Sequence, residues 1–332
     1  ATTDIGIDAA FLNNKITLTA DYFYKKTSDI LLQLPIPGIV GISTEPYVNA
    51  ASVKNEGWEF ALGYNDQWGD WKFGANVNFS KVKNEILDLH GKDSWITDWS
   101  INLEGHPINS YYGYVADGLY RTQAEVDEAN EKNSVGGGAL KLGDIRYKDV
   151  SGPEGKPDGV VDTYDRTVIG NPFPDFTYGF NVNLGWKNLD LTVDMMGVYG
   201  NEIYRNWGSS SYAQLNYRTE QLNRWHGEGT SNWEPLLDPS HKINQEASTY
   251  FIEDGSFFRI RNIELGYNFD KRLLNRIKVQ SLRLYTNVQN PKTWSRNGGY
   301  TPEVGGSAIS FGIDGGGYPM PTVYTIGFNL TF

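Results

Sequence analysis

The chain has 332 residues and a formal net charge of −11, with 40 acidic against 29 basic residues, which argues against nucleic acid as a partner. It has no cysteine, and this excludes disulfides and thiolate chemistry. No apolar run approaches the roughly 18 residues of a transmembrane helix, but membrane strands escape such a scan because half of their residues are polar. The chain begins ATTDIG, without an initiator methionine or signal peptide, so we expect a mature product or a fragment of a longer protein.

Apolar and polar residues alternate along nine segments, which predicts nine β-strands because side chains on a strand point alternately to its two faces. In FTYGFNVNLGW, residues 176–186, rings and aliphatic side chains fall on one face, and small or polar residues fall on the other. The same design recurs in WKFGANVNFS and KITLTADYFY. The predicted strands span residues 3–12, 15–27, 53–65, 70–84, 175–187, 189–200, 256–269, 278–288 and 322–332.

The connections between these strands are alternately short and long along the whole chain. The long ones cover residues 28–52, 85–174, 201–255 and 289–321. In a meander, strict alternation places every short turn at one end of the sheet and every long loop at the other. We therefore expect residues 85–174 to form one large loop rather than further strands of the sheet.

Two architectures have alternating strands, the β-sandwich and the transmembrane β-barrel. Sandwich strands are usually about 5–6 residues long, whereas several of these reach 11 to 13. Aromatic residues gather near the strand ends, as they do in the interfacial girdles of outer-membrane barrels. They are Trp58, Trp71, Trp186, Phe269 and Phe332. Together with the unequal connections, this predicts an all-β, transmembrane antiparallel barrel with long extracellular loops.

The chain ends on TVYTIGFNLTF, in which apolar residues alternate with small or polar ones up to the last phenylalanine. Thr325, Gly327, Leu330 and Phe332 fit the polar-x-Gly-x-x-apolar-x-aromatic ending that the machinery inserting outer-membrane barrels recognises. Alone, such an ending could arise by chance in any β-protein, but here it follows eight similar strands. We interpret these four residues as a barrel-insertion signal on the closing strand.

Four stretches of the chain share one further pattern. They are LNNKITLTADYFYKKTSDILLQLPIP (12–37), NAASVKNEGWEFALGY (49–64), EGHPINSYYGYVADGLYRT (104–122) and DGVVDTYDRTVIGNPFPDFTYGFNVNLGW (158–186). These stretches resemble the C-terminal part of SusC/RagA-type TonB-dependent transporters. The resemblance implies a barrel of 22 strands, of which residues 1–332 supply the last nine, with a plug and a TonB box in an N-terminal part. It also implies a SusD-like lipoprotein over the extracellular mouth.

The same resemblance implies an orientation in the outer membrane. If strand 322–332 runs towards a periplasmic C-terminus, counting back makes strand 3–12 run the same way, as the fourteenth strand of 22 should. Ala1 and the long loops are then extracellular. The partners so implied are the N-terminal part of the same transporter, the SusD-like lipoprotein, TonB and outer-membrane lipid.

The stretch DVSGPEGKPDGVVDTYDR, residues 149–166, has the pattern of an EF-hand-like calcium loop once PEGKP (153–157) is left out. Calcium binds six to eight hard oxygens, which carboxylates, a hydroxyl, a carbonyl and water supply. The insertion departs from the usual pattern, as does an Asp where the last ligand is usually Glu. The alternative is an Asp/Gly turn ordered by hydrogen bonds alone. The candidate Ca²⁺ ligands are Asp149, Ser151, Asp158, the Val160 carbonyl, Asp162 and Asp165, with Gly159 at the turn.

Enzymatic chemistry finds little support in the sequence. The four histidines, His90, His106, His226 and His241, are scattered over predicted loops without the spacing of zinc ligands. No nucleophile-elbow pattern occurs, and the two GGG runs lack the Lys-Ser/Thr of a phosphate loop. We therefore expect a protein that is not an enzyme.

Aromatic residues in the long loops are the candidates for substrate binding. Flat rings beside Asn, Asp and Arg suit the faces and hydroxyls of sugars, and they suit peptides as well. The alternative is that most of these rings fill the loop cores or contact the lid protein. The candidates are Trp95, Trp99, Tyr111, Tyr112, Trp207, Tyr212, Trp225 and Trp294.

The leading functional interpretation is active, TonB-dependent import of oligosaccharides or peptides across the outer membrane. A barrel this wide would leave a large hole, so selectivity requires a plug. The alternative is a passive porin or a glycan-binding outer-membrane adhesin, neither of which needs a TonB box. A soluble glycan-binding β-protein comes third, and it would be extracted without detergent.

Overall fold

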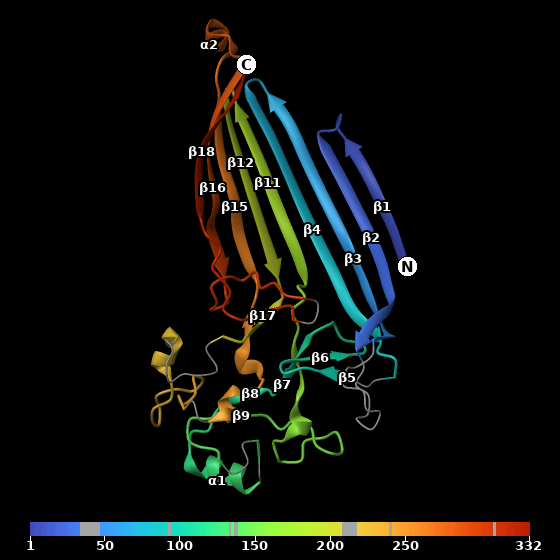
Figure 1. Ribbon diagram of the computed structural model, residues 1–332, viewed down its shortest axis with the longest axis vertical. Helices are drawn as coiled ribbons and strands as arrows, with labels where there is room; N and C mark the ends of the chain where they lie inside the picture. The colour runs from blue at the N-terminus through green and yellow to red at the C-terminus, as the bar shows by residue number, and fades with distance from the viewer. Residues whose placement is uncertain are drawn as a thin grey trace.

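The computed structural model describes residues 1–33, 47–91, 94–132, 134–135, 139–207, 218–238, 241–307 and 310–332. Nine strands form one antiparallel sheet whose spatial order follows the chain (Figure 1). They are β1 (Thr2–Phe11), β2 (Ile16–Gln33), β3 (Tyr47–Trp68), β4 (Trp71–Asp88), β11 (Phe176–Trp186), β12 (Leu189–Tyr199), β15 (Phe257–Asn268), β16 (Ser281–Ser295) and β18 (Val323–Thr331). The nine predicted strands and their up-and-down order are confirmed. The sheet is open between β1 and β18, so a barrel of 22 strands stays a prediction.

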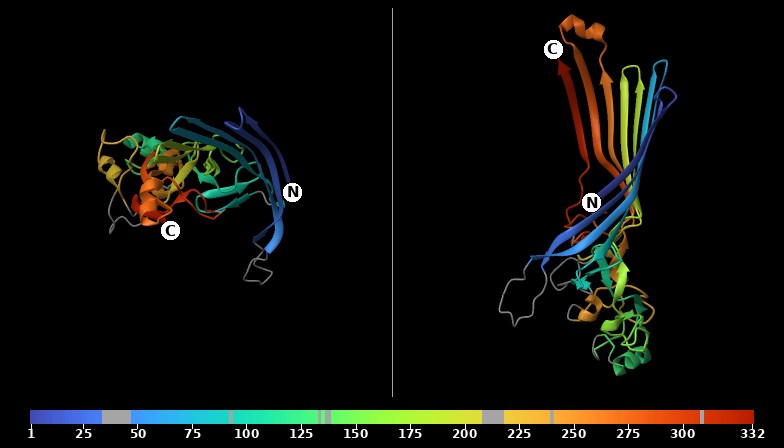
Figure 2. Two further views of the ribbon diagram at one scale, coloured as in Figure 1. Left: turned by 90° about the horizontal axis from the view of Figure 1, so that it is seen from above. Right: turned by 90° about the vertical axis from the view of Figure 1, so that its right-hand side faces the viewer.

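Several strands run further into the long connections than the alternation predicted. The pairing of β3 with β4 continues through Val53 opposite Ile86, and the Lys54 ammonium lies 3.1 Å from the Glu85 carboxylate. Ala51, Val53, Ile86 and Leu89 form a buried apolar cluster in the same region. Opposite charges and apolar packing therefore both stabilise the extended pairing. A bulge between Ser52 and Val53 interrupts the register there, and Figure 2 shows β2 and β3 curving away from the remaining strands.

The sheet has one apolar and one polar face, as the alternation predicted. Val182 of β11 lies opposite Val193 of β12, whereas its neighbour Asn181 lies opposite Asp194. The apolar face is uncovered, and Ile326 of β18 is 82% exposed on it. A continuous apolar surface of this size requires a partner. Lipid is the partner expected from the apolar-out, polar-in alternation of outer-membrane barrels.

Two glycines let neighbouring strands approach a tyrosine ring. A Cβ atom on Gly327 would lie 2.5 Å from the ring of Tyr285 on β16, and one on Gly197 would lie 2.1 Å from the ring of Tyr178 on β11. No larger residue fits at either position without a shift of the ring. Gly327, which we interpreted as part of the insertion signal, therefore also has a packing role in β18.

The short connections all lie at one end of the sheet (Figure 1). Asn13 and Asn14 have φ of 56° and 63°, which is the left-handed conformation that a tight hairpin turn needs. Trp71 and Trp186 meet there with their ring centroids 5.8 Å apart. The connection from β15 to β16 is longer and forms the short helix α2 (Lys271–Leu274), followed by the 3-10 turn η6 (Asn275–Ile277).

The long connections pack together at the opposite end into a unit that we call the loop domain. It consists of the described parts of residues 89–175, 200–256 and 296–322, and none of its described strands joins the nine-stranded sheet. Its small sheets have the orders β10-β7-β6-β5, β14-β13-β17 and β8-β9. Its strands and helix are β5 (Ser94–Ile96), β6 (Ser100–Leu103), β7 (Ser110–Gly113), β8 (Ala116–Leu119), α1 (Gln123–Glu131), β9 (Ile145–Tyr147), β10 (Thr167–Gly170), β13 (Glu202–Arg205), β14 (Ile252–Asp254) and β17 (Ile313–Asp314). The 3-10 turns are η2 (Thr163–Asp165), η3 (Thr219–Asn223), η4 (Lys242–Gln245) and η5 (Thr249–Phe251).

Helices are few and short. Among the described residues, no helix combines the length and the apolar character needed to cross a membrane.

The apolar face can be tested by placing a charge on it. We expect Val182→Arg in the full-length protein to lower the free energy of unfolding by about 2–4 kcal/mol, because the guanidinium would enter lipid near the midplane. Asn183→Arg is the matched control, since Asn183 lies at the same depth on the polar face. Denaturant unfolding in lipid vesicles measures both. An equal cost for the two variants would contradict the assignment of the faces.

Candidate functional site

Tyr111 of β7 joins three of the long connections. Its hydroxyl lies 3.0 Å from the carbonyl oxygen of Glu202 and 2.8 Å from that of Gly312. The side chain is fully buried, and burial raises the pKa of the phenol well above its usual range, so the hydroxyl stays protonated and donates. The ring therefore offers no surface to a ligand. The structure therefore gives Tyr111 a structural role in place of the contact with substrate that we expected.

Trp225 is likewise part of the hydrophobic core of the loop domain. The side chain is 4% exposed, and its ring occupies the space where a Cβ atom on Gly143 would lie. Gly143 has a φ of +87°, so this position favours glycine for its backbone as well. Trp99 packs against the same core, 6.1 Å from the ring of Tyr204. Trp225 thus also has a packing role in place of the predicted contact with substrate. The sequence alone does not show this role, because only the fold brings Gly143 beneath the Trp225 ring.

Three other predicted aromatic residues are half-buried. The guanidinium of Arg166 lies 4.7 Å from the ring centre of Tyr112, and the indole N–H of Trp207 donates to the Asp314 carboxylate at 2.8 Å. Trp95 lies on β5 and is half-buried. These rings keep part of their surface accessible, so their contact with substrate stays a prediction.

Trp294 lies on the nine-stranded sheet rather than in the loop domain. It is 50% exposed and stacks on Phe258 with ring centroids 5.7 Å apart. Phe258 lies opposite Gly197, on the apolar face. Trp294 therefore belongs to the surface that we expect to contact lipid, and not to a substrate site on the polar face. Tyr212 lies outside the described residues.

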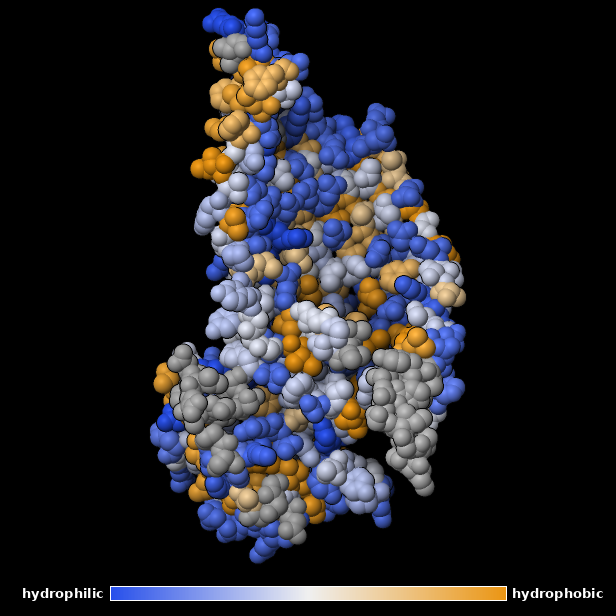
Figure 3. Space-filling model, in the orientation of Figure 1, coloured by the Kyte–Doolittle hydropathy of each residue, from blue (hydrophilic) through white to orange (hydrophobic). Residues whose placement is uncertain are grey.

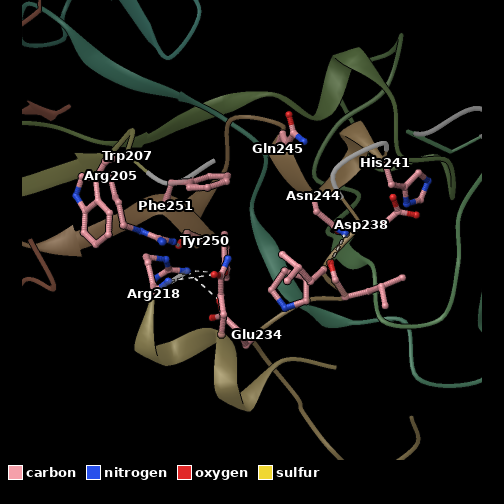
Figure 4. Close-up of a pocket in the computed structure, with 14 residues that line it drawn as sticks. Arg205, Trp207, Arg218, Glu234, Asp238, His241, Asn244, Gln245, Tyr250 and Phe251 are labelled. Carbon is pink, nitrogen blue, oxygen red and sulfur yellow. Dashed lines mark hydrogen bonds and ion pairs between the residues drawn. The ribbon is translucent and has the colours of Figure 1, made fainter. Parts of the chain in front are cut away.

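A crevice between β13, η3 and η5 gathers charged and aromatic side chains that the sequence did not single out (Figure 4). Arg218 lies 2.9 Å from Glu234, and the hydroxyl of Tyr250 donates to the same carboxylate at 2.9 Å. The guanidinium of Arg205 lies 5.2 Å from the ring centre of Tyr250 and pairs with Glu253 at 3.2 Å. The cavity measures about 30 Å³, which holds about one water molecule and excludes a sugar ring. The crevice is thus a compensated structural network.

Asp144 organises the neighbouring part of the loop domain. One carboxylate oxygen accepts the Lys141 N–H at 2.7 Å, and the other lies 3.0 Å from both the His241 ring and the Asn244 amide. The side chain is fully buried, and burial raises the pKa of this carboxyl. His241 therefore has a structural partner, which agrees with the absence of any zinc-ligand spacing in the sequence.

The polar face of the sheet forms a connected network of amides and paired charges. Arg283 contacts the carboxylates of Asp190 and Glu264, the second at 2.8 Å. The Asn287 amide donates to Asn262 at 2.6 Å. Asn181, Asn183, Asp190 and Asp194 share this face. Arg283 and Glu264 were not predicted from the sequence, although both occupy polar positions in strands whose apolar and polar residues alternate.

Next to the loop domain, this polar face is hollowed. The hollow measures about 950 Å³ and is bounded by strands β4, β11, β12, β15 and β16. Arg259 at its edge pairs with Glu303 of the loop domain. Polar and apolar side chains both line this hollow, which extends from the sheet to Glu303 of the loop domain, and it is the candidate surface for contact with a substrate.

The predicted calcium loop is ordered by hydrogen bonds to its own backbone. Asp165 is fully buried, and its carboxylate accepts the N–H groups of Val150 at 2.7 Å, Ser151 at 2.9 Å and Asp162 at 2.7 Å. Both oxygens of Asp165 are thus engaged. This geometry corresponds to the alternative that the sequence left open, a turn ordered by hydrogen bonds.

The remaining candidate ligands do not converge on one point. Asp149 accepts the N–H of Gly159, and Asp158 accepts that of Val160 at 3.0 Å. Within the described ranges, no three acidic or histidine side chains are placed together so that they could hold a metal ion. Calcium needs six to eight oxygens around one point, so the loop would have to rearrange to bind it, and calcium binding stays a prediction. One feature favours a cation, because the second oxygen of Asp149 is buried without a hydrogen-bond partner.

A two-faced antiparallel meander with short turns at one end and a folded loop domain at the other defines the wall of an outer-membrane β-barrel. The chain matches the family "TonB dependent receptor-like, beta-barrel" over residues 1–291 and belongs to it. TonB-dependent receptors are outer-membrane proteins and transporters, which is consistent with the expectation of a protein that is not an enzyme.

Individual relatives support the same assignment. The chain is 30% identical to TonB-dependent receptor P3 of Formosa agariphila, over 99% of this chain and 34% of that protein. It is 27% identical to TonB-dependent receptor SusC of Bacteroides thetaiotaomicron, over 100% of this chain and 32% of SusC. The solved structure of the RagAB peptide transporter shares the fold, with a TM-score of 0.78 at 24% identity, over 100% of this chain and 35% of that one. The predicted SusC/RagA-type family is confirmed, and the chain spans about a third of the length of these relatives.

The hydrogen bonds of Asp165 give a prediction that does not depend on calcium. We expect Asp165→Ala to lower the local stability of residues 149–166 by about 3 kcal/mol or more, because it leaves three backbone N–H groups without their acceptor. Asp158→Ala, which removes one exposed acceptor, is the control. Hydrogen exchange of the full-length protein measures the change. Equal protection in the two variants would refute the role of Asp165.

Proposed function

We propose that this chain is part of an outer-membrane importer that takes up oligosaccharides or peptides with energy supplied through TonB. The observation that supports this best is the construction of the wall, with an apolar face for lipid and a continuous polar face for the interior. On the polar face, Asn181, Asn262 and Asn287 lie on three different strands and donate or accept side-chain hydrogen bonds across the sheet. Membership in the TonB-dependent receptor family supports the energy source.

The open edges of the sheet support the proposal that a longer chain completes the barrel. β1 and β18 each pair with a neighbour on one side only. In lipid, each unsatisfied backbone group costs several kcal/mol, so neither edge is tolerated there. We propose that both edges pair with strands from the N-terminal part of the same transporter, to give 22 strands around a plug.

The loop domain is the proposed contact for a SusD-like lipoprotein lid and for incoming substrate. The solved relative whose fold this chain shares is named as a peptide transporter, whereas oligosaccharides are the substrates that we propose first. Among the loop aromatics, Tyr300 is 72% exposed, Tyr318 is 97% exposed and Trp233 is 50% exposed. Rings this exposed suit stacking on sugars better than the buried Tyr111 and Trp225 do.

Uptake experiments test the proposed function. We expect a strain that expresses the full-length protein to accumulate labelled oligosaccharide, and deletion of TonB to abolish this accumulation, because a plugged barrel needs energy to open. The same strain without the transporter is the control. Accumulation that is independent of TonB would indicate a passive porin, and surface binding without accumulation would indicate an adhesin. Accumulation of labelled peptides alone would replace the proposed substrate class and keep the importer.

We also propose that the 149–165 loop binds Ca²⁺, with Asp149 as its first ligand. The order of candidate ligands in the sequence supports this, as does the buried and unpartnered oxygen of Asp149. The loop would then exchange some of its backbone hydrogen bonds for metal contacts.

Calorimetric titration of the full-length protein with Ca²⁺ tests the loop. We expect one site that Asp149→Asn abolishes, because the variant loses a carboxylate charge at the first ligand position. Glu154→Gln is the matched control, since Glu154 is exposed within the insertion of the same loop. No heat of binding in the wild type, or equal binding by Asp149→Asn, would show that the loop is a hydrogen-bonded turn.

A further inference from the structure

The short connections at one end of the sheet differ in how their positive charges are compensated. Lys15, next to the β1–β2 turn, lies 2.7 Å from the Asp66 carboxylate. Lys187, in the β11–β12 turn, lies 3.9 Å from the Asp70 carboxylate. At these connections, each cation therefore has an acidic partner nearby.

The connection from β15 to β16 has an uncompensated surplus of positive charge. Residues 270–278 read DKRLLNRIK, with four basic residues against the single carboxylate of Asp270. That carboxylate accepts the N–H of Arg272 at 2.8 Å and so caps the start of α2. The four basic side chains are exposed, and none pairs with a carboxylate in the part of the chain that the structure describes. They are Lys271, Arg272, Arg276 and Lys278.

This basic connection begins directly after an aromatic pair at the end of the apolar face. Tyr267 lies opposite Leu189 and Leu284 on that face, and its ring meets Phe269 edge-on, 5.1 Å away. Aromatic rings at such positions mark the boundary between hydrocarbon and headgroups. Figure 3 shows hydrophilic residues at the tip formed by α2, beyond a band of hydrophobic residues. The four cations are therefore placed at the depth of lipid headgroups.

The two leucines of α2 differ in their exposure. Leu274 is 3% exposed and its backbone carbonyl accepts the N–H of Val279, itself 8% exposed, so one side of α2 is anchored. Leu273 is 57% exposed. An exposed leucine among four cations is the arrangement of a surface that inserts an apolar side chain between lipids while its charges stay at the phosphates.

We propose that residues 270–278 bind the phosphate groups of anionic phospholipids in the periplasmic leaflet of the outer membrane. The charge complementarity is local, since the chain as a whole has a net charge of −11. This inference rests on the proposed function in one respect only, which is the orientation of the chain with its short connections on the periplasmic side. Binding would hold the β15–β16 end of the wall at a defined depth and would fall as ionic strength rises.

Native mass spectrometry of the full-length transporter with added phosphatidylglycerol or phosphatidylethanolamine tests this inference. We expect wild-type protein to prefer phosphatidylglycerol, and replacement of all four basic residues by Gln to weaken its binding by about tenfold or more. Lys15→Gln/Lys187→Gln is the matched control, because it removes cations from the same rim that already have acidic partners. We expect this control to change binding by less than about twofold. Should the fourfold variant fail to fold, the two pairs Lys271→Gln/Arg272→Gln and Arg276→Gln/Lys278→Gln are each expected to weaken binding.

Three results would overturn the inference. They are equal binding of the two phospholipids by wild type, unchanged binding in the fourfold variant, and an equal loss in the control variant. TonB-dependent uptake is measured in parallel, so that the two proposals are separated. Reduced uptake with unchanged lipid binding would assign the basic connection to a periplasmic protein partner instead. Normal uptake without lipid preference refutes this inference alone, whereas absent uptake in wild type refutes the proposed function.

Discussion

The whole structure depends on the pairing of backbone N–H and C=O groups between neighbouring strands. A membrane offers these groups no water, so a sheet that crosses it must satisfy them internally. Unbroken pairing fixes the side-chain period at two, and this period separates the apolar from the polar face. It also confines irregular backbone to the ends, where α2 lies at one end and the loop domain at the other. The faces, the turns and the loop domain are all consequences of this requirement.

Specific contacts hold the long connections to one another and to the sheet. Tyr111 reaches the carbonyl groups of Glu202 and Gly312, which are 91 and 201 residues away in the sequence. Arg259 of β15 pairs with Glu303, so one buried guanidinium joins the wall to the last long connection. Because Arg259 and Glu303 also line the hollow on the polar face, the shape of this hollow depends on how the last long connection packs.

The strands could be predicted from the sequence because their signal is local. Alternation is visible within ten residues, and the register follows from short turns such as Asn13-Asn14. The loop domain could not be predicted in the same way, since burial of Tyr111 and Trp225 requires partners far away in the sequence. The extra length of β3 and β4 was missed for a third reason. It is stabilised by an ion pair between Lys54 and Glu85 and by an apolar cluster that includes Val53 and Ile86, and these partners lie on different strands. The sequence identified the candidate aromatic residues of the loops, but only the fold shows which of them are buried in the core and which are exposed.

The chemistry of the polar face bears on which substrates the wall suits. Arg283 lies between Asp190 and Glu264, so one cation faces two carboxylates. Asp194 on the same face accepts hydrogen bonds from the amides of Asn181 and Asn262. Many of the other polar groups on this face are side-chain amides, and those of Asn262 and Asn287 are hydrogen-bonded to one another. A surface of amides with a small surplus of carboxylates exchanges hydrogen bonds with hydroxyl groups at little electrostatic cost, but it repels a strongly anionic ligand. For the importer proposed above, this wall would suit neutral, hydroxyl-rich molecules better than anionic ones, and the selection of an anionic substrate would have to come from the loop domain or from the rest of the barrel.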